Sequence, residues 1–262
     1  MSKPEAARPR QAGRVEYPLR GLMAAAALHY AAYVIMQTLA LFAETRRGPS
    51  LPDLVLDLLP AQRQLDFMNS TVWLTALLFS IALLGFRRPY ACINYLRVGA
   101  AVSLLRGIAI VLTSLGPPAA TQNGVPALFV SLSVDQITPA LLLRQWIPLD
   151  VLWGGSGLSA AFLSQDLFFS GHVASTFLLL LVVRRRDPFF LVFLAFHLNT
   201  VLFLFLTHEH YSIDILAAYF FVYASYVFAD RKGLLSKMPE SNASEREAAC
   251  ASIARLPGKN HD

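Results

Sequence analysis

Two short polar motifs in an otherwise apolar chain carry residue types suited to phosphoryl chemistry. Ser170-Gly171-His172 leads into one apolar stretch, and His210 with Asp214 opens another. An i, i+4 spacing places His210 and Asp214 on one helical face, where the carboxylate can accept a hydrogen bond from one ring nitrogen. The other nitrogen is then held as a nucleophile or base. His172 could give a proton to an oxygen that leaves phosphorus.

The residues around these motifs suit the binding of an anion. Ser170 can cap the helix that follows it, and Gly171 keeps the approach to the free backbone N–H groups unobstructed. Arg106 lies near the middle of a third apolar stretch, where a charge must face protein or water rather than lipid. A phosphate is a natural partner for Arg106, and Asp135 or another acid is the alternative.

Structural interpretations of the same residues stand beside the functional ones. A single histidine at a membrane edge is usually structural or solvated, and an i, i+4 His/Asp pair can be a polar link between helices. Two such motifs, on separate helices and at one membrane face, favour function. We predict a structural role for His197, which is surrounded by apolar residues, and interfacial anchoring for Trp73, Trp146 and Trp153.

The elements that must position these residues are membrane helices. The 262 residues are 55% hydrophobic and 15% charged, with a mean hydropathy of +0.49, which excludes an ordinary soluble domain. Six stretches approach the roughly 20 residues that a spanning helix needs: 21–42, 68–86, 95–115, 168–183, 189–206 and 211–228. We predict an all-α integral membrane protein with six transmembrane helices.

The predicted organisation is a tail over 1–20, a six-helix domain over 21–230 and a second tail over 231–262. The loop over 116–165 is long and contains several prolines. The shorter segment 52–60 begins and ends with proline. Because long loops in compact proteins usually have a function, we expect interfacial or re-entrant helices there that cover the site.

The distribution of basic residues predicts how the chain threads the membrane. Fourteen Lys and Arg residues flank one set of helix ends and four flank the other. The positive-inside rule makes both termini cytosolic, so His172, His210 and Asp214 face the exoplasmic, periplasmic or lumenal side. The net charge of +5 thus reflects orientation rather than a nucleic-acid partner.

The sequence predicts no metal and no other cofactor. The two cysteines, Cys92 and Cys250, cannot build a zinc site. The two motifs supply a nucleophile and proton carriers rather than a cluster of carboxylate ligands.

Two longer segments around the motifs carry a family resemblance. The first is Gly154-Gly155-Ser156-Gly157-Leu158-Ser159 followed by the run from Asp166 to His172; the second is His208-Glu209-His210-Tyr211-Ser212-Ile213-Asp214 followed by Ala217-Ala218-Tyr219. Weaker matches are Leu51-Pro52-Asp53 and Leu105-Arg106-Gly107-Ile108. At these residues the sequence resembles the sphingomyelin synthase and ceramide phosphoethanolamine synthase branch of the lipid phosphate phosphatase superfamily.

The resemblance implies a role for each matching residue. His210 would be the nucleophile that takes the headgroup phosphate, Asp214 its orienter and His172 the proton shuttle, with Asp166 and Glu209 as acidic neighbours. Supporting or phosphate-binding roles are expected for the remaining candidates: Ser170, Gly171, Tyr211 and Arg106.

The expected reaction moves phosphocholine or phosphoethanolamine from a glycerophospholipid to ceramide. Diacylglycerol is the second acceptor, because the segment from Phe169 to Ala174 also looks similar to the plant-type phosphatidylcholine:diacylglycerol cholinephosphotransferases. The partners are thus a phospholipid donor, a lipid alcohol acceptor and membrane lipids, without nucleic acid. A homo-oligomer is compatible with the sequence.

Two other classes remain as alternatives. A lipid phosphate phosphatase would let water attack the phosphohistidine, but the Lys-x6-Arg-Pro pattern of that family is absent from the membrane domain. Leu204 also stands where that family has an arginine six residues before the second histidine. A phosphate monoester carries more negative charge than a diester and would need those cations. A transporter would be favoured by inverted repeats and paired broken helices, and the sequence shows neither.

Overall fold

The described part of the chain is helical, which confirms the predicted all-α membrane class. The computed structural model describes residues 18–46, 48–118, 132–147, 168–183, 185 and 187–236. Its helices are α1 (Leu19–Glu44), α2 (Leu54–Leu58), α3 (Trp73–Arg87), α4 (Pro89–Thr113), α5 (Pro139–Trp146), α7 (Gly171–Val182), α8 (Phe189–Thr207) and α9 (Ser212–Arg231). A π-helical turn, Met68–Val72, leads directly into α3, and short 3-10 turns cover Arg63–Leu65 and Val134–Gln136.

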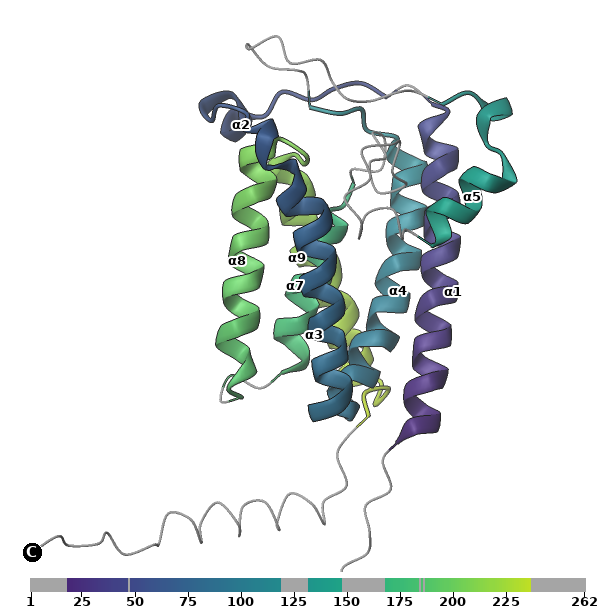
Figure 1. Ribbon diagram of the computed structural model, residues 1–262, viewed down its shortest axis with the longest axis vertical. Helices are drawn as coiled ribbons and strands as arrows, with labels where there is room; N and C mark the ends of the chain where they lie inside the picture. Colours follow the sequence, from purple (N-terminus) through teal and green to yellow (C-terminus); the bar gives the residue numbers. More distant parts are fainter. Residues whose placement is uncertain are drawn as a thin grey trace, which may run out of the picture.

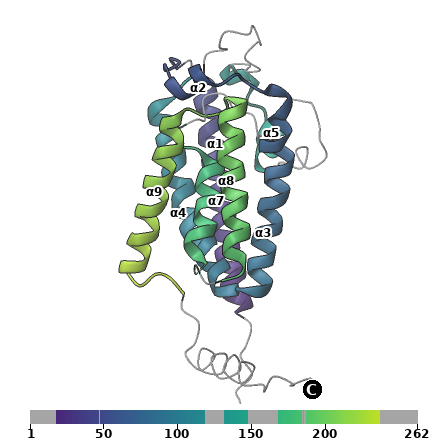
Figure 2. The ribbon, with the colours of Figure 1, turned by 90° about the vertical axis from the view of Figure 1, so that its left-hand side faces the viewer.

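Five of these helices are long and apolar enough to cross a bilayer: α1, the continuous helix Met68–Arg87, α4, α8 and α9, all within the described ranges. The fourth predicted span is shorter than expected. Helix α7 has 12 residues, and a rise of 1.5 Å per residue gives about 18 Å, which is less than the hydrocarbon core of about 30 Å. It packs inside the bundle against α4, α8 and α9 (Figures 1 and 2).

The helix ends sort into two groups at opposite ends of the bundle. The start of α1 and the end of α9 lie at the same end of the bundle (Figure 1). At that same end the α3–α4 turn is joined to the α7–α8 connection by an ion pair of 2.7 Å between Arg88 Nε and Asp187 Oδ2. The starts of α7 and α9 point to the opposite end. The structure therefore brings the two histidine motifs to one end of the bundle, as the sequence predicted.

Helix α4 lies at the centre of the packing, in contact with α1, α3, α7 and α9. Its buried side chains join those of α7 and α9 in the main apolar core, which includes Val98, Val102, Val173 and Ala218. On its other side, a Cβ at Gly107 would lie 3.2 Å from Met36 Cα. Small residues of this kind let membrane helices approach closely, so α1 and α4 form a tight pair.

Helices α2 and α5 are the short loop helices that the sequence predicted, but α5 packs beside α1 rather than over the site (Figure 1). Polar side chains cause this docking. Tyr33 Oη donates to Gln145 O at 3.2 Å, Gln145 Nε2 to Gln37 Oε1 at 2.7 Å, and Trp146 Nε1 to Thr38 Oγ1 at 3.0 Å. Trp146 thus makes a hydrogen-bonded contact between α5 and α1. Trp153 lies outside the described residues.

His197 links three helices in the apolar interior, in agreement with its predicted structural role. Its Nδ1 lies 2.8 Å from Thr176 Oγ1 on α7, and its Nε2 lies 2.8 Å from Tyr219 Oη on α9. The Thr176 hydroxyl also lies 2.9 Å from the His172 carbonyl oxygen, to which it donates. Thr176 Oγ1 then accepts from Nδ1–H, and Tyr219 donates to Nε2, so every group in the chain is satisfied.

We expect His197→Phe to lower the free energy of unfolding by about 1–3 kcal/mol. Phenylalanine fills the ring volume but leaves the Thr176 and Tyr219 hydroxyls without their partner in the bundle interior. Thermal unfolding in detergent micelles measures the effect. The control is Leu198→Ala, at a side chain that is 59% exposed on the same helix. A melting temperature for His197→Phe equal to that of the control would contradict the structural role.

Candidate active site

His210 and Asp214 form a buried pair at the start of α9. Their side chains are 5% and 0% exposed, and His210 Nδ1 lies 3.6 Å from Asp214 Oδ2. That distance is within ion-pair range but longer than the hydrogen bond expected from the spacing. Asp214 Oδ2 accepts the backbone N–H of Tyr211 at 2.9 Å, which fixes the carboxylate. Nδ1 faces Asp214, and Nε2 is therefore the nitrogen that could react.

His172 stands in the first turn of α7, beside His210. The centroids of the two imidazole rings are 5.9 Å apart. Ser170 is the N-cap of α7, as predicted: its Oγ accepts the Val173 N–H at 3.4 Å, and its own N–H donates to Asp214 O at 3.2 Å. A direct backbone hydrogen bond thus joins the two motifs, which are far apart in the sequence.

The tautomer of His172 follows from its partner. His172 Nε2 lies 2.9 Å from the carbonyl oxygen of Asn69. A carbonyl only accepts, so Nε2 carries a hydrogen and the lone pair of a neutral ring is on Nδ1. Nδ1 is therefore the atom that could take up a proton and later release it.

Arg106 supplies a buried cation at the start of α7. Its Nε donates to Phe169 O at 2.7 Å, and the residue is 8% exposed, so it faces protein as predicted. A Cβ at Gly171 would lie 3.2 Å from Arg106 Cζ, which explains the glycine. Together with the N-terminal turn of α7, Arg106 creates a positive potential suited to a phosphate. Asp135, the alternative partner, is exposed in the turn Val134–Gln136.

Asn69 and Trp73 also belong to this site, although the sequence did not single them out as functional. Asn69 lies within the π-helical turn, and Trp73 is the first residue of α3. Besides accepting from His172, Asn69 donates through Nδ2 to Thr207 Oγ1 at 2.8 Å. The Trp73 ring lies 4.2 Å from that of His172, centroid to centroid. The Trp73 ring therefore packs against a candidate catalytic side chain, a contact that the predicted anchoring role did not include. π-Helical turns occur often at functional sites, but nothing in the local sequence marks this one.

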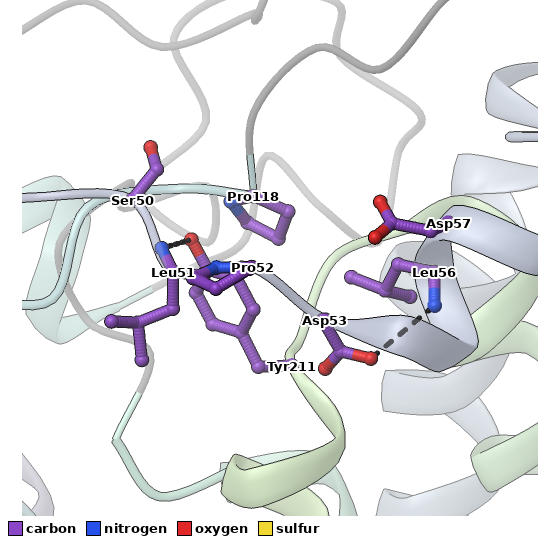
Figure 3. Close-up of a pocket in the computed structure, with 8 residues that line it drawn as sticks. All are labelled: Ser50, Leu51, Pro52, Asp53, Leu56, Asp57, Pro118 and Tyr211. Atoms are coloured by element: carbon purple, nitrogen blue, oxygen red, sulfur yellow. Dashed lines mark hydrogen bonds between the residues drawn. The ribbon is translucent and has the colours of Figure 1, made fainter.

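The remaining predicted site residues are Tyr211, Glu209 and Asp166. Tyr211 Oη donates to Gly116 O at 3.0 Å and accepts the Leu51 N–H at 3.0 Å (Figure 3), so its hydroxyl holds loop backbone. Burial raises the pKa of Tyr211, which keeps that hydroxyl protonated. Glu209 is half-buried next to His210. Asp166 lies outside the described residues.

Asp53, the N-cap of α2, connects α2 to the start of α9 through hydrogen bonds. Its Oδ1 accepts from the Val55 N–H at 2.9 Å and from Ser212 Oγ at 2.9 Å, while Oδ2 accepts from the Ser212 N–H at 2.6 Å. One carboxylate therefore caps both α2 and α9. A pocket opens between residues 50–57 and Tyr211 (Figure 3), and neither catalytic histidine candidate lines it.

We expect the stability conferred by Asp53 to depend on pH. Burial pushes the pKa of Asp53 upward, but hydrogen bonds from Ser212 and from the Leu56 and Val55 amides outweigh burial and hold the pKa below its ordinary value. The unfolded chain then binds the proton more tightly. The contribution is present above the unfolded pKa of about 4 and is lost as the pH falls through the lower folded pKa.

Thermal unfolding of Asp53→Asn across acidic and neutral pH measures this contribution. The variant should be less stable than the wild type at neutral pH and should lose less stability on acidification. Asp57→Asn is the matched control, because Asp57 is exposed on the same segment. Identical pH profiles for the two variants would contradict the capping role.

The described residues contain no group of three or more His, Cys, Asp or Glu side chains that could hold a metal ion.

The comparison with known families matches the segment that carries the two histidine motifs. Residues 165–231 match the family model described as PAP2 superfamily C-terminal. This range contains α7, α8 and α9 and therefore His172, His210 and Asp214. No curated protein matches the chain. The family match supports membership of the lipid phosphate phosphatase, or PAP2, superfamily and hence an enzyme that acts on phosphate esters.

Proposed function

We propose that the chain is a lipid headgroup transferase that moves phosphocholine or phosphoethanolamine from a glycerophospholipid to ceramide. The observation that carries the proposal is the pairing of His172 with His210, whose ring centroids are 5.9 Å apart, with Asp214 behind His210. A phosphoryl group between the two rings would have a nucleophile on one side and a proton donor on the other. The resemblance to sphingomyelin synthases supports the same reaction.

In the first step, His210 Nε2 attacks phosphorus, and the bond from phosphorus to the diacylglycerol oxygen breaks. A protonated His172 gives its Nδ1 proton to that oxygen, so diacylglycerol leaves as a neutral alcohol. The headgroup stays on His210 as a phosphohistidine, and Asp214 stabilises the positive charge that develops on the ring.

In the second step, His172 acts as the base. Its Nδ1 takes the proton from the hydroxyl of the acceptor lipid while that oxygen attacks phosphorus. The bond from phosphorus to nitrogen breaks, which regenerates free His210 and restores the protonated His172. Both steps use the same two nitrogens in opposite senses, as microscopic reversibility requires.

The charges of the site fit a diester better than a monoester. Arg106 and the first turn of α7 stabilise the extra negative charge that develops on the equatorial oxygens in the transition state. A diester brings one negative charge into the buried site, whereas a monoester brings up to two and would need further cations. Diacylglycerol as acceptor uses identical chemistry. Lipid phosphate hydrolysis is the second candidate, because the family match covers phosphatases as well.

The test uses purified protein in proteoliposomes with headgroup-labelled phosphatidylcholine or phosphatidylethanolamine. Ceramide and diacylglycerol are offered separately, and a labelled lipid monoester is offered in a third reaction. We expect label in a sphingolipid. Label that appears only in diacylglycerol-derived lipid would change the acceptor, and release of phosphate from the monoester alone would replace transfer by hydrolysis. Placing the labelled donor in one leaflet of sealed vesicles tests the proposed exoplasmic, periplasmic or lumenal site.

A further inference from the structure

The indole N–H of Trp73 is a buried donor without a hydrogen-bond partner among the described residues. Buried tryptophan N–H groups normally find an acceptor, because leaving one unpaired forfeits the hydrogen bond that water supplied. Trp146 shows the ordinary case: its Nε1 donates to Thr38 Oγ1 at 3.0 Å. Trp73 therefore requires an explanation that Trp146 does not.

The Trp73 ring lies beside His172, one of the two candidate catalytic histidines. It is inclined at 56° to the His172 ring, with centroids 4.2 Å apart, and the centroid of the His210 ring lies 5.9 Å from that of His172. Nε2 of His172 already donates to Asn69 O, so this nitrogen cannot accept from the indole. Two further buried atoms of the same site lack a hydrogen-bond partner, His210 Nδ1 and Asp214 Oδ1.

The electrostatics of the site favour an anionic acceptor for this N–H. Arg106 and the first turn of α7 already create a positive potential beside His172. An indole N–H adds a directed donor without adding a formal charge. Such donors stabilise charge that develops in a reaction because they are fixed before it begins.

We propose that Trp73 is a substrate-binding residue whose indole N–H donates to a non-bridging oxygen of the phosphoryl group held between His172 and His210. The inference rests on the proposed function for the identity of the reaction, but the binding step requires only a phosphoryl group at this place. The contact is strongest when negative charge builds on that oxygen during the transfer of the headgroup to His210.

Trp73→Phe keeps an aromatic ring at this position but removes the N–H together with part of the indole ring system. We expect kcat/KM for headgroup transfer to fall roughly tenfold to hundredfold, mainly through kcat. Trp146→Phe is the matched control, because it removes an indole N–H outside the site, and it should retain wild-type activity. Equal activity of the two variants would overturn the role of Trp73.

A second measurement does not depend on turnover. Protein with ¹⁵N-labelled indoles in dodecyl maltoside is titrated with orthovanadate, a phosphoryl mimic, and Trp73→Phe assigns the signal. We expect the Trp73 indole proton to move downfield while that of Trp146 stays in place. A Trp73 signal that orthovanadate leaves unmoved would overturn the inference.

The two measurements separate this inference from the proposed function. A shift of Trp73 without headgroup transfer by the wild type would remove the transferase and keep the phosphoryl contact. Transfer by the wild type at a rate that Trp73→Phe leaves unchanged would keep the transferase and remove the contact.

Discussion

Replacing His210 by alanine is expected to lower the rate of headgroup transfer by roughly a thousandfold to a millionfold. Removal of the nucleophile has an effect of this size in other enzymes that form a covalent intermediate. Without the imidazole no phosphohistidine can form, and the residual rate is that of direct attack by the acceptor alcohol. The measurement is the transfer of labelled headgroup by purified protein. A second assay quenches the wild type in base, where phosphohistidine survives, and seeks label on the protein.

The control for this prediction is a half-buried histidine away from the site. His29 lies on α1, and its Nδ1 is 3.1 Å from Leu96 O. His29→Ala should keep the covalent label and most of the transfer activity. If His210→Ala transferred headgroup as fast as His29→Ala, His210 would not be the nucleophile.

Replacing Asp214 by asparagine is expected to lower kcat by about 10²- to 10⁴-fold, the range seen when the orienting acid of a catalytic triad is neutralised. Asparagine keeps the size of the side chain and can still accept the Tyr211 N–H. It removes the negative charge 3.6 Å from His210 Nδ1 and can turn an amide donor toward that nitrogen. The ring then loses both its preferred tautomer and the stabilisation of its positive charge.

Asp230→Asn, on an exposed side chain at the other end of α9, is the matched control. Melting temperatures for both variants separate loss of fold from loss of chemistry. A folded Asp214→Asn with the kcat of Asp230→Asn would show that the carboxylate does not orient His210.

The parts of the site that the sequence predicted follow from local geometry. An i, i+4 spacing fixes His210 and Asp214 on one face of any helix that contains them. The alternation of helices in a bundle carries the starts of α7 and α9 to the same end. The serine before α7 is a common N-cap, and Ser170 occupies that position.

The parts that the sequence did not predict depend on contacts between distant segments. Trp73 follows a π-helical turn and contacts His172, which lies 99 residues further along the chain. The hydroxyl of Tyr211 is bound by Leu51 and Gly116, which no spacing rule connects with it. The docking of α5 on α1 likewise depends on side-chain pairs such as Gln37 with Gln145.

The shared capping by Asp53 limits where a lipid can reach the site. Separating α2 from the start of α9 would leave the amide and the hydroxyl of Ser212 without their acceptor. Parting two helices that meet only through apolar side chains breaks no hydrogen bond, because lipid tails replace those contacts with others of the same kind. For the proposed lipid transferase, a substrate that arrives within the bilayer is therefore expected to enter at an apolar helix boundary, while the α2–α9 corner stays closed.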